Sequence, residues 1–240
     1  MSALPEWLVI LIMTLGAGLS IPLGAWLARC ENIQPKWLEQ ELRHFIMAFG
    51  GGALLSAVAF VLVPEGSKNL STSVSCLAFA AGGLAFLGLD YLLAKSKTPA
   101  SQLAAMLSDF VPEAIALGAA FTKEPNVAIL LAGLIAMQNV PEGFNAYREM
   151  TASKTMSGGR VLRIFLCLAL LGPICGLTGH FFLADAKTFV GVMELFAAGG
   201  ILYLVIQDIA PQAKLEKHWL PGFGAVLGFL LGLLGHLLTQ

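Results

Sequence analysis

Long apolar stretches separated by short polar connections recur along the whole chain. Eight of these stretches reach about 20 residues, the length at which an α-helix crosses the hydrocarbon core of a bilayer. A closed β-barrel would instead need alternating strands of about ten residues, so the pattern predicts helices throughout. The predicted spans are residues 6–29, 44–65, 72–94, 100–121, 127–147, 161–183, 187–210 and 220–239.

The composition agrees with an all-α membrane protein. Hydrophobic residues make up 57% of the 240 residues and charged residues only 12%, whereas soluble domains carry about 25% charged residues. The connections are too short to hold a soluble domain, so we expect residues 1–240 to form a single transmembrane domain. The net charge of −1 gives no nucleic-acid-binding footprint.

The basic residues predict the orientation. If the N-terminus lies outside, the cytoplasmic loops and span ends hold 11 of the 14 Lys and Arg residues, and the outer loops hold Lys68, Lys123 and Lys187. Basic residues concentrate on the cytoplasmic side, so both termini are expected outside. The segment before the first span lacks a basic region, and we expect that span to be a retained helix. The expected location is the cytoplasmic membrane of a prokaryote.

The second and seventh predicted spans align without a gap, although they cross the membrane in opposite directions. This predicts an inverted repeat of spans 1–3 and 6–8 around a central pair, spans 4 and 5. The alternative is that two glycine-rich apolar helices resemble each other by composition. Inverted repeats are common in secondary transporters, which bind substrate near the midplane. The aligned pairs include Phe49 with Phe196, Gly52 with Gly199, Leu55 with Leu202, Val58 with Val205 and Pro64 with Pro211.

Four acidic residues fall inside or near the inner halves of the predicted spans: Asp109, Glu113, Glu142 and Asp208. At about 3 kcal/mol each, their insertion costs on the order of 12 kcal/mol. Spans 4 and 5 contain no Lys or Arg, so intramembrane ion pairs are a poor explanation. A wet crevice, a proton relay or a cation-binding pathway would each offset the cost, and the pattern favours the cation pathway.

The spacing of polar residues in spans 4 and 5 predicts a shared site. Asp109 and Glu113 are four residues apart, which places them on one helical face, and Gln138 and Glu142 repeat that spacing. The connection between the spans is short, so the two helices should pack antiparallel. A proline directly before each glutamate is expected to bend the helix and free backbone carbonyls nearby. These four side chains are therefore the predicted cation ligands.

Further polar residues lie nearer the ends of the spans. Glu65 would be an entrance acid or a solvated helix end, and both readings stay open. Gln207 and Asp208 precede a proline in span 7, where they would form part of an exit or a polar pair at the end of the helix. Asp90 and Glu194 are expected to reach the membrane interface.

These motifs resemble the ZIP (Zrt/Irt-like) family of divalent-metal transporters. Residues 138–143 read Gln-Asn-Val-Pro-Glu-Gly, which matches the family's His/Gln-Asn/Asp-x-Pro-Glu-Gly in span 5. Residues 109–114 are similar to the His-Asn-x-Pro-Glu-Gly of span 4. Residues 207–208 stand where the family often has a polar pair before a proline, and residues 64–65 where it commonly has Pro-Glu. The resemblance implies eight spans, a 3+2+3 inverted arrangement, outer termini and a metal site between spans 4 and 5.

The chain departs from the family pattern at three positions. Asp109 replaces a histidine, Phe110 an asparagine, and Gly172 a glutamate that many members carry in span 6. The resemblance then implies one principal metal site, with Asn139 as an outer ligand and the second position lost or weakened. The family suggests zinc or iron. All-oxygen ligands instead suit harder ions such as Mn²⁺, so the metal stays open.

The expected function is import of a divalent metal ion, Zn²⁺, Fe²⁺ or Mn²⁺, and not an enzymatic reaction. The ion would pass Glu65, bind between spans 4 and 5, and leave past Gln207 and Asp208 when one helix bundle moves against the other. Two alternatives remain: a proton-coupled carrier of another small solute, and a non-transporting membrane sensor or scaffold. The expected partners are the metal ion and the lipid bilayer, and a homodimer is left open.

Overall fold

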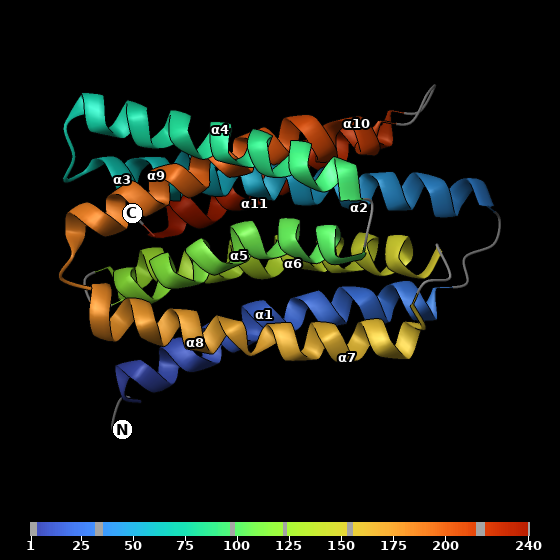
Figure 1. Ribbon diagram of the computed structural model, residues 1–240, viewed down its shortest axis with the longest axis horizontal. Helices are drawn as coiled ribbons and strands as arrows, with labels where there is room; N and C mark the ends of the chain where they lie inside the picture. Colours follow the sequence, from blue (N-terminus) through green and yellow to red (C-terminus); the bar gives the residue numbers. More distant parts are fainter. Residues whose placement is uncertain are drawn as a thin grey trace.

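The computed structural model describes residues 4–31, 36–96, 99–121, 124–152, 156–214 and 219–239, and every regular element in these ranges is a helix (Figure 1). Three π-helical segments, Val58–Leu62, Gly179–Leu183 and Val205–Ile209, continue α-helices without a break in the chain. The α-helices are α1 (Glu6–Cys30), α2 (Lys36–Ala57), α3 (Val63–Ser67), α4 (Thr72–Ser96), α5 (Pro99–Phe121), α6 (Pro125–Ala152), α7 (Gly158–Ala169), α8 (Leu171–Thr178), α9 (Lys187–Leu204), α10 (Ala210–Ala213) and α11 (Leu220–Thr239).

The molecule is an all-α membrane protein. Within the described residues, seven helices are long and apolar enough to cross a bilayer. Large apolar side chains also cover the outside, Leu77, Leu84, Phe182 and Leu238 among them, each more than two-thirds exposed. Such a surface is expected where lipid replaces water. The helix of the fourth predicted span, α5, has 23 residues, and its crossing of the membrane stays a prediction.

The helices follow the predicted spans closely and extend beyond them at two polar stretches. Helix α2 begins at Lys36 and α6 runs to Ala152, whereas the predicted spans were 44–65 and 127–147. Residues of good helix propensity, such as Lys, Glu, Gln and Leu, continue these helices past the apolar core. Helices α5 and α6 are continuous through their internal prolines.

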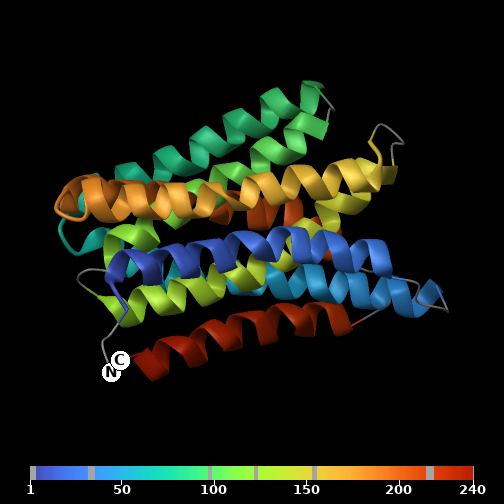
Figure 2. The same ribbon diagram turned by 90° about the horizontal axis from the view of Figure 1, so that it is seen from below.

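The helices form two groups that face each other (Figures 1 and 2). The first group contains α1, α5, α6, α7 and α8, and the second contains α2, α3, α4, α9, α10 and α11. The start of α1 and the end of α11 lie at the same end of the molecule (Figure 2). Helices α5 and α6, which carry the predicted site, face the second group through α9 and α2, respectively.

Glycines allow backbone-to-backbone contact at four helix crossings, two within the first group and two within the second. At each crossing, a Cβ added to either of two glycines would collide with the backbone of the partner helix, so the helices pack at the shortest distance that membrane proteins use. The glycine pairs are Gly24 and Gly143 at α1–α6, Gly118 and Gly179 where α5 meets α8 and its continuation, Gly52 and Gly228 at α2–α11, and Gly82 and Gly199 at α4–α9.

Where α2 of the second group meets α6 of the first, a side chain lies between the two backbones. A Cβ at Gly50 of α2 would lie 2.7 Å from Cγ of the Pro141 ring of α6. The ring therefore fills the space above this glycine, directly beside Glu142.

The aligned spans share their local geometry. The alignment that pairs Phe49 with Phe196 also pairs the π-helical segment Val58–Leu62 with the π-helical segment Val205–Ile209, and a proline follows two residues after each. The contacts correspond as well. A Cβ added at Gly228 would collide with the backbone carbonyl of Phe49. A Cβ added at Gly82 would collide in the same way with the carbonyl of Phe196, the residue aligned with Phe49.

Candidate functional site

Glu113 of α5 and Gln138 of α6 meet in the centre of the first helix group. The side-chain amide of Gln138 donates a hydrogen bond of 2.7 Å to Oε2 of Glu113, and both residues are fully buried. The short connection between α5 and α6 folds the helices antiparallel, which brings these residues together although 25 positions separate them in the sequence. Two of the four predicted ligands are therefore in direct contact.

Asn139 is held by the neighbouring helix. Its side-chain amide donates a hydrogen bond of 2.8 Å to the backbone carbonyl of Ala17 in α1, and the residue is 1% exposed. Both Gln138 and Asn139 thus use their amide nitrogens for fixed contacts. Within the described residues, their buried carbonyl oxygens, Oε1 and Oδ1, have no hydrogen-bond partner. Buried polar atoms of this kind call for a ligand, an ion or water.

Glu142 opens into a pocket of about 100 Å³, which we name the Asp208 pocket. This pocket lies between α2, α5, α6 and the end of the α9–α10 segment. Its polar lining comes from Glu142, Asn145, Glu149, Asp208 and Gln212, and its apolar lining from Met47, Met106, Ala146, Leu204 and Ile209.

One face of α6 leads from the buried pair to this pocket. Gln138, Glu142, Asn145 and Glu149 are spaced by four, three and four residues, so they form a single stripe along the helix. Exposure increases along the stripe from buried Gln138 to exposed Glu149. Sequence reasoning missed Asn145 and Glu149. The same helical spacing, continued past Glu142, would have found both.

The structure places the side chains of Gln207 and Asp208 in different surroundings. Both belong to the π-helical segment Val205–Ile209, but Asp208 lines the Asp208 pocket while Gln207 is exposed outside it. Gln207 therefore does not line the pocket beside Asp208, and the role of the two residues in an exit stays a prediction. Adjacent residues on a helix point about 100° apart, so only one of them faces the pocket.

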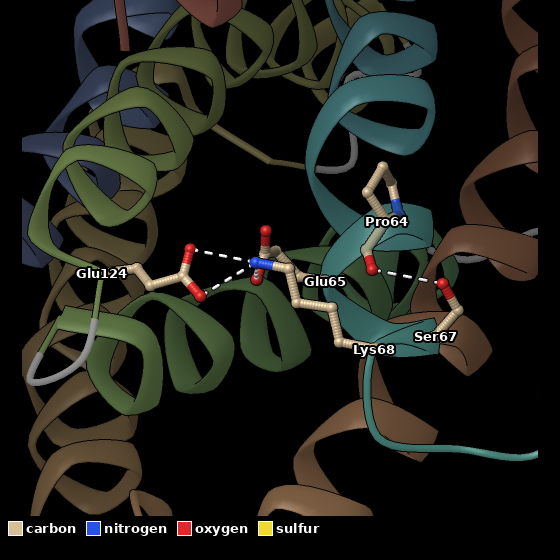
Figure 3. Close-up of polar contacts among 5 residues, drawn as sticks. All are labelled: Pro64, Glu65, Ser67, Lys68 and Glu124. Atoms are coloured by element: carbon tan, nitrogen blue, oxygen red, sulfur yellow. Dashed lines mark hydrogen bonds and ion pairs between the residues drawn. The ribbon is translucent and has the colours of Figure 1, made fainter. Parts of the chain in front are cut away.

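Glu65 lies at the opposite end of the α9 segment, in a pocket of about 430 Å³ that we name the Lys68 pocket. Nζ of Lys68 lies 2.7 Å from Oε2 of Glu65 and 2.9 and 3.1 Å from the two carboxylate oxygens of Glu124 (Figure 3). Burial lowers the pKa of Lys68, but the hydrogen bonds and charges of Glu124 and Glu65 outweigh it and raise that pKa above its ordinary value. Glu65 is thus an ion-paired acid in a pocket. Sequence reasoning gave no indication of its partners.

Glu194 lines the same pocket and is only 6% exposed. Helix α9 turns this side chain towards α3 and the start of α6, and its depth in the membrane stays a prediction. Asp90, the other residue expected at the interface, accepts a hydrogen bond of 3.0 Å from the Tyr203 hydroxyl.

Phe110 and Gly172 are in contact. The Phe110 ring is 1% exposed, and its Cζ would lie 3.1 Å from a Cβ added at Gly172. The aromatic ring of α5 therefore occupies the space that a side chain at residue 172 would need. Phe110 and Gly172 are far apart in the sequence, but in the structure the large side chain at one position fits the missing side chain at the other.

The predicted ligand Asp109 has its side chain outside the described part of the structure, so the four-residue ligand set is not assembled here in full. Among the described residues, no three His, Cys, Asp or Glu side chains lie close enough together to hold a metal ion. What the structure brings together is Glu113 with Gln138, and Glu142 one turn further along the same face of α6.

Neither the comparison with protein-family models nor the comparison with curated proteins gives a match for this chain.

Proposed function

We propose that this protein is a ZIP-like importer of divalent metal ions, with the ion held between α5 and α6. The observation that carries the proposal is the buried pair of Glu113 and Gln138, whose hydrogen bond turns the free Oε1 of Gln138 into the interior. A carboxylate and an amide oxygen are ligands that hard divalent cations prefer. Glu142 extends this oxygen-rich region to a polar pocket.

We further propose eight membrane spans in a 3+2+3 inverted repeat. The π-helical segments and the glycine contacts at equivalent positions support this arrangement. The two pockets support it as well. The alignment pairs Glu194 and Glu65 of the Lys68 pocket with Met47 and Gln212 of the Asp208 pocket. Pockets at corresponding places on opposite sides of a central site are expected for alternating access.

The direction of transport follows from the charge distribution. With most basic residues in the cytoplasm, the Lys68 pocket faces outward and the Asp208 pocket inward. The ion would enter past Glu65, bind beside Glu113 and Gln138, and leave through Glu142 and Asp208. Movement of one helix group against the other would alternate the openings, since close backbone contacts lie inside the groups.

The contact between Phe110 and Gly172 supports a single principal ion position. In the ZIP pattern, polar residues at both places would supply ligands for a second ion, but here a ring fills that volume. The remaining ligands are all oxygen atoms, which favours Mn²⁺ over Zn²⁺ on chemical grounds. The resemblance itself points to zinc or iron.

Uptake into proteoliposomes tests the proposal. Purified full-length protein should carry Mn²⁺, Zn²⁺ or Fe²⁺ inward down a gradient, and Glu113→Ala and Glu142→Ala should each reduce the rate at least tenfold. Glu6→Ala, an exposed acid at the start of α1, is the control and should leave uptake unchanged. Full uptake in both variants would refute the site. Proton flux without metal flux would favour the carrier of another solute, and metal binding without flux would favour a sensor.

A further inference from the structure

Carboxylates from three separate elements line the Lys68 pocket. Glu65 belongs to α3, Glu124 directly precedes α6, and Glu194 lies in α9. Two ammonium groups face the same pocket, those of Lys68 and Lys187. The lining therefore holds three carboxyl groups and two ammonium groups. This cluster is separate from the buried pair between α5 and α6.

Glu194 is the residue that points to a ligand. The residue is more than nine-tenths buried and lines the pocket, and within the part of the chain that the structure describes its carboxylate forms no hydrogen bond or ion pair. The charged groups that act on it are Glu65, Lys68 and Glu124. A buried carboxylate without a partner is costly, so this group holds a proton unless a cation in the pocket takes the proton's place.

The size of the pocket favours an ion that keeps its water. Among the described residues, these three carboxylates are not close enough together to coordinate one bare ion directly. A water molecule takes about 30 Å³, so an ion with six waters needs on the order of 200 Å³. The pocket of about 430 Å³ is large enough for that. Mg²⁺ and similar ions lose water reluctantly and commonly bind carboxylates with several waters retained.

Lys68 already supplies a positive charge at this place. Its ammonium lies between Glu65 and Glu124, while its side chain is 46% exposed. A flexible, half-exposed lysine can move into solvent at little cost. We propose that the Lys68 pocket is a binding site for a hydrated divalent cation, and that Lys68 is an exchangeable occupant that the cation displaces.

Displacement would have a structural effect. The ion pair of Lys68 with Glu124 joins α3 of the second helix group to the start of α6 in the first group. A cation that releases Lys68 also releases this link. The site does not depend on transport, so it can be tested separately from the proposed function.

Cobalt(III) hexaammine is a suitable probe because its ammine ligands do not exchange, so it binds only where a hydrated ion would bind. Titration calorimetry on the purified full chain should show Lys68→Met binding this probe at least tenfold more tightly than the wild type. Lys68→Arg, which keeps the charge, should stay near the wild type. Equal affinity in Lys68→Met and the wild type would overturn the proposal.

A second variant identifies the acid. In the Lys68→Met protein, adding Glu194→Gln should weaken probe binding at least tenfold, and unchanged binding would contradict the proposal. If this variant does not fold, Glu65→Gln at the more exposed edge of the pocket tests the same cluster with the same expected direction. Glu113→Gln should leave probe binding unchanged. Loss of probe binding in Glu113→Gln would assign the ion to the central site and overturn the proposal.

Discussion

The amide of Gln138 donates to the carboxylate of Glu113 across the interface of α5 and α6, over a distance of 2.7 Å and without exposure to solvent. This contact fixes which end of the Gln138 amide faces the carboxylate. The oxygen end is then left as an acceptor inside the protein. The helix pair therefore presents oxygen atoms to its interior and no basic side chain from its central segments.

Gln138→Glu tests this arrangement. The substitution places two carboxylates about a hydrogen-bond length apart, so they repel unless a cation or a shared proton lies between them. We expect a lower melting temperature without metal and a larger increase on adding Mn²⁺ than in the wild type. A tenfold gain in affinity would add about 1.4 kcal/mol of stability at saturating metal. Gln40→Glu, at an exposed position of α2, is the control, and an equal response in both variants would contradict the site.

Asp109→His tests the fourth predicted ligand, whose side chain lies outside the described residues. Imidazole nitrogen binds Zn²⁺ in preference to Mn²⁺. The ratio of Zn²⁺ to Mn²⁺ affinity should therefore increase about tenfold, as measured by competition binding on the purified protein. Ser108→His is the matched control because the adjacent residue points about 100° away on the same helix. The absence of any change in the ratio would mean that Asp109 faces elsewhere.

Gly143→Ala tests the packing of α6 against α1. The added methyl group would collide with the backbone of Ile21, so we expect a loss of about 1–3 kcal/mol and a lower melting temperature. Gly133→Ala on the same helix meets nothing within 4 Å and should be neutral or slightly stabilising. If both variants melt at the same temperature, the close approach of the two helices is not needed for stability.

The sequence was sufficient to predict the helices and the α5–α6 pairing because each depends on a local pattern. Apolar length gives the spans, and four-residue spacing gives a helical face. Glu149 was missed since the apolar stretch stops before the helix does, and helix-forming polar residues carry α6 on to Ala152.

The Lys68 pocket could not have been predicted in the same way. Glu65, Glu124 and Glu194 come together through the packing of α3, α6 and α9, and no spacing rule connects them. The contact of Phe110 with Gly172 is similar. Both departures are visible in the sequence. That the Phe110 ring fills the space beside Gly172 depends on how α5 crosses α8.

Asp208→Asn tests the proposed exit. Asp208 lines the pocket next to Glu142, and removing its charge should slow metal uptake by proteoliposomes several-fold while leaving metal binding at the central pair intact. Gln207→Ala is the matched control because its side chain is exposed outside the pocket. A larger effect from Gln207→Ala than from Asp208→Asn would place the pathway on the other side of α9.

Labelling of single cysteines tests the orientation. Cys30 is exposed at the end of α1, whereas Asn126 is exposed at the start of α6, and the proposed topology places them on opposite sides of the membrane. With the other cysteines replaced by serine, a membrane-impermeant maleimide should label Asn126→Cys, but not Cys30, in right-side-out vesicles. Permeabilised vesicles, in which both positions should react, provide the control. Labelling of Cys30 alone in sealed vesicles would reverse the topology. The Asp208 pocket would then face outward, and the same sites would describe an exporter.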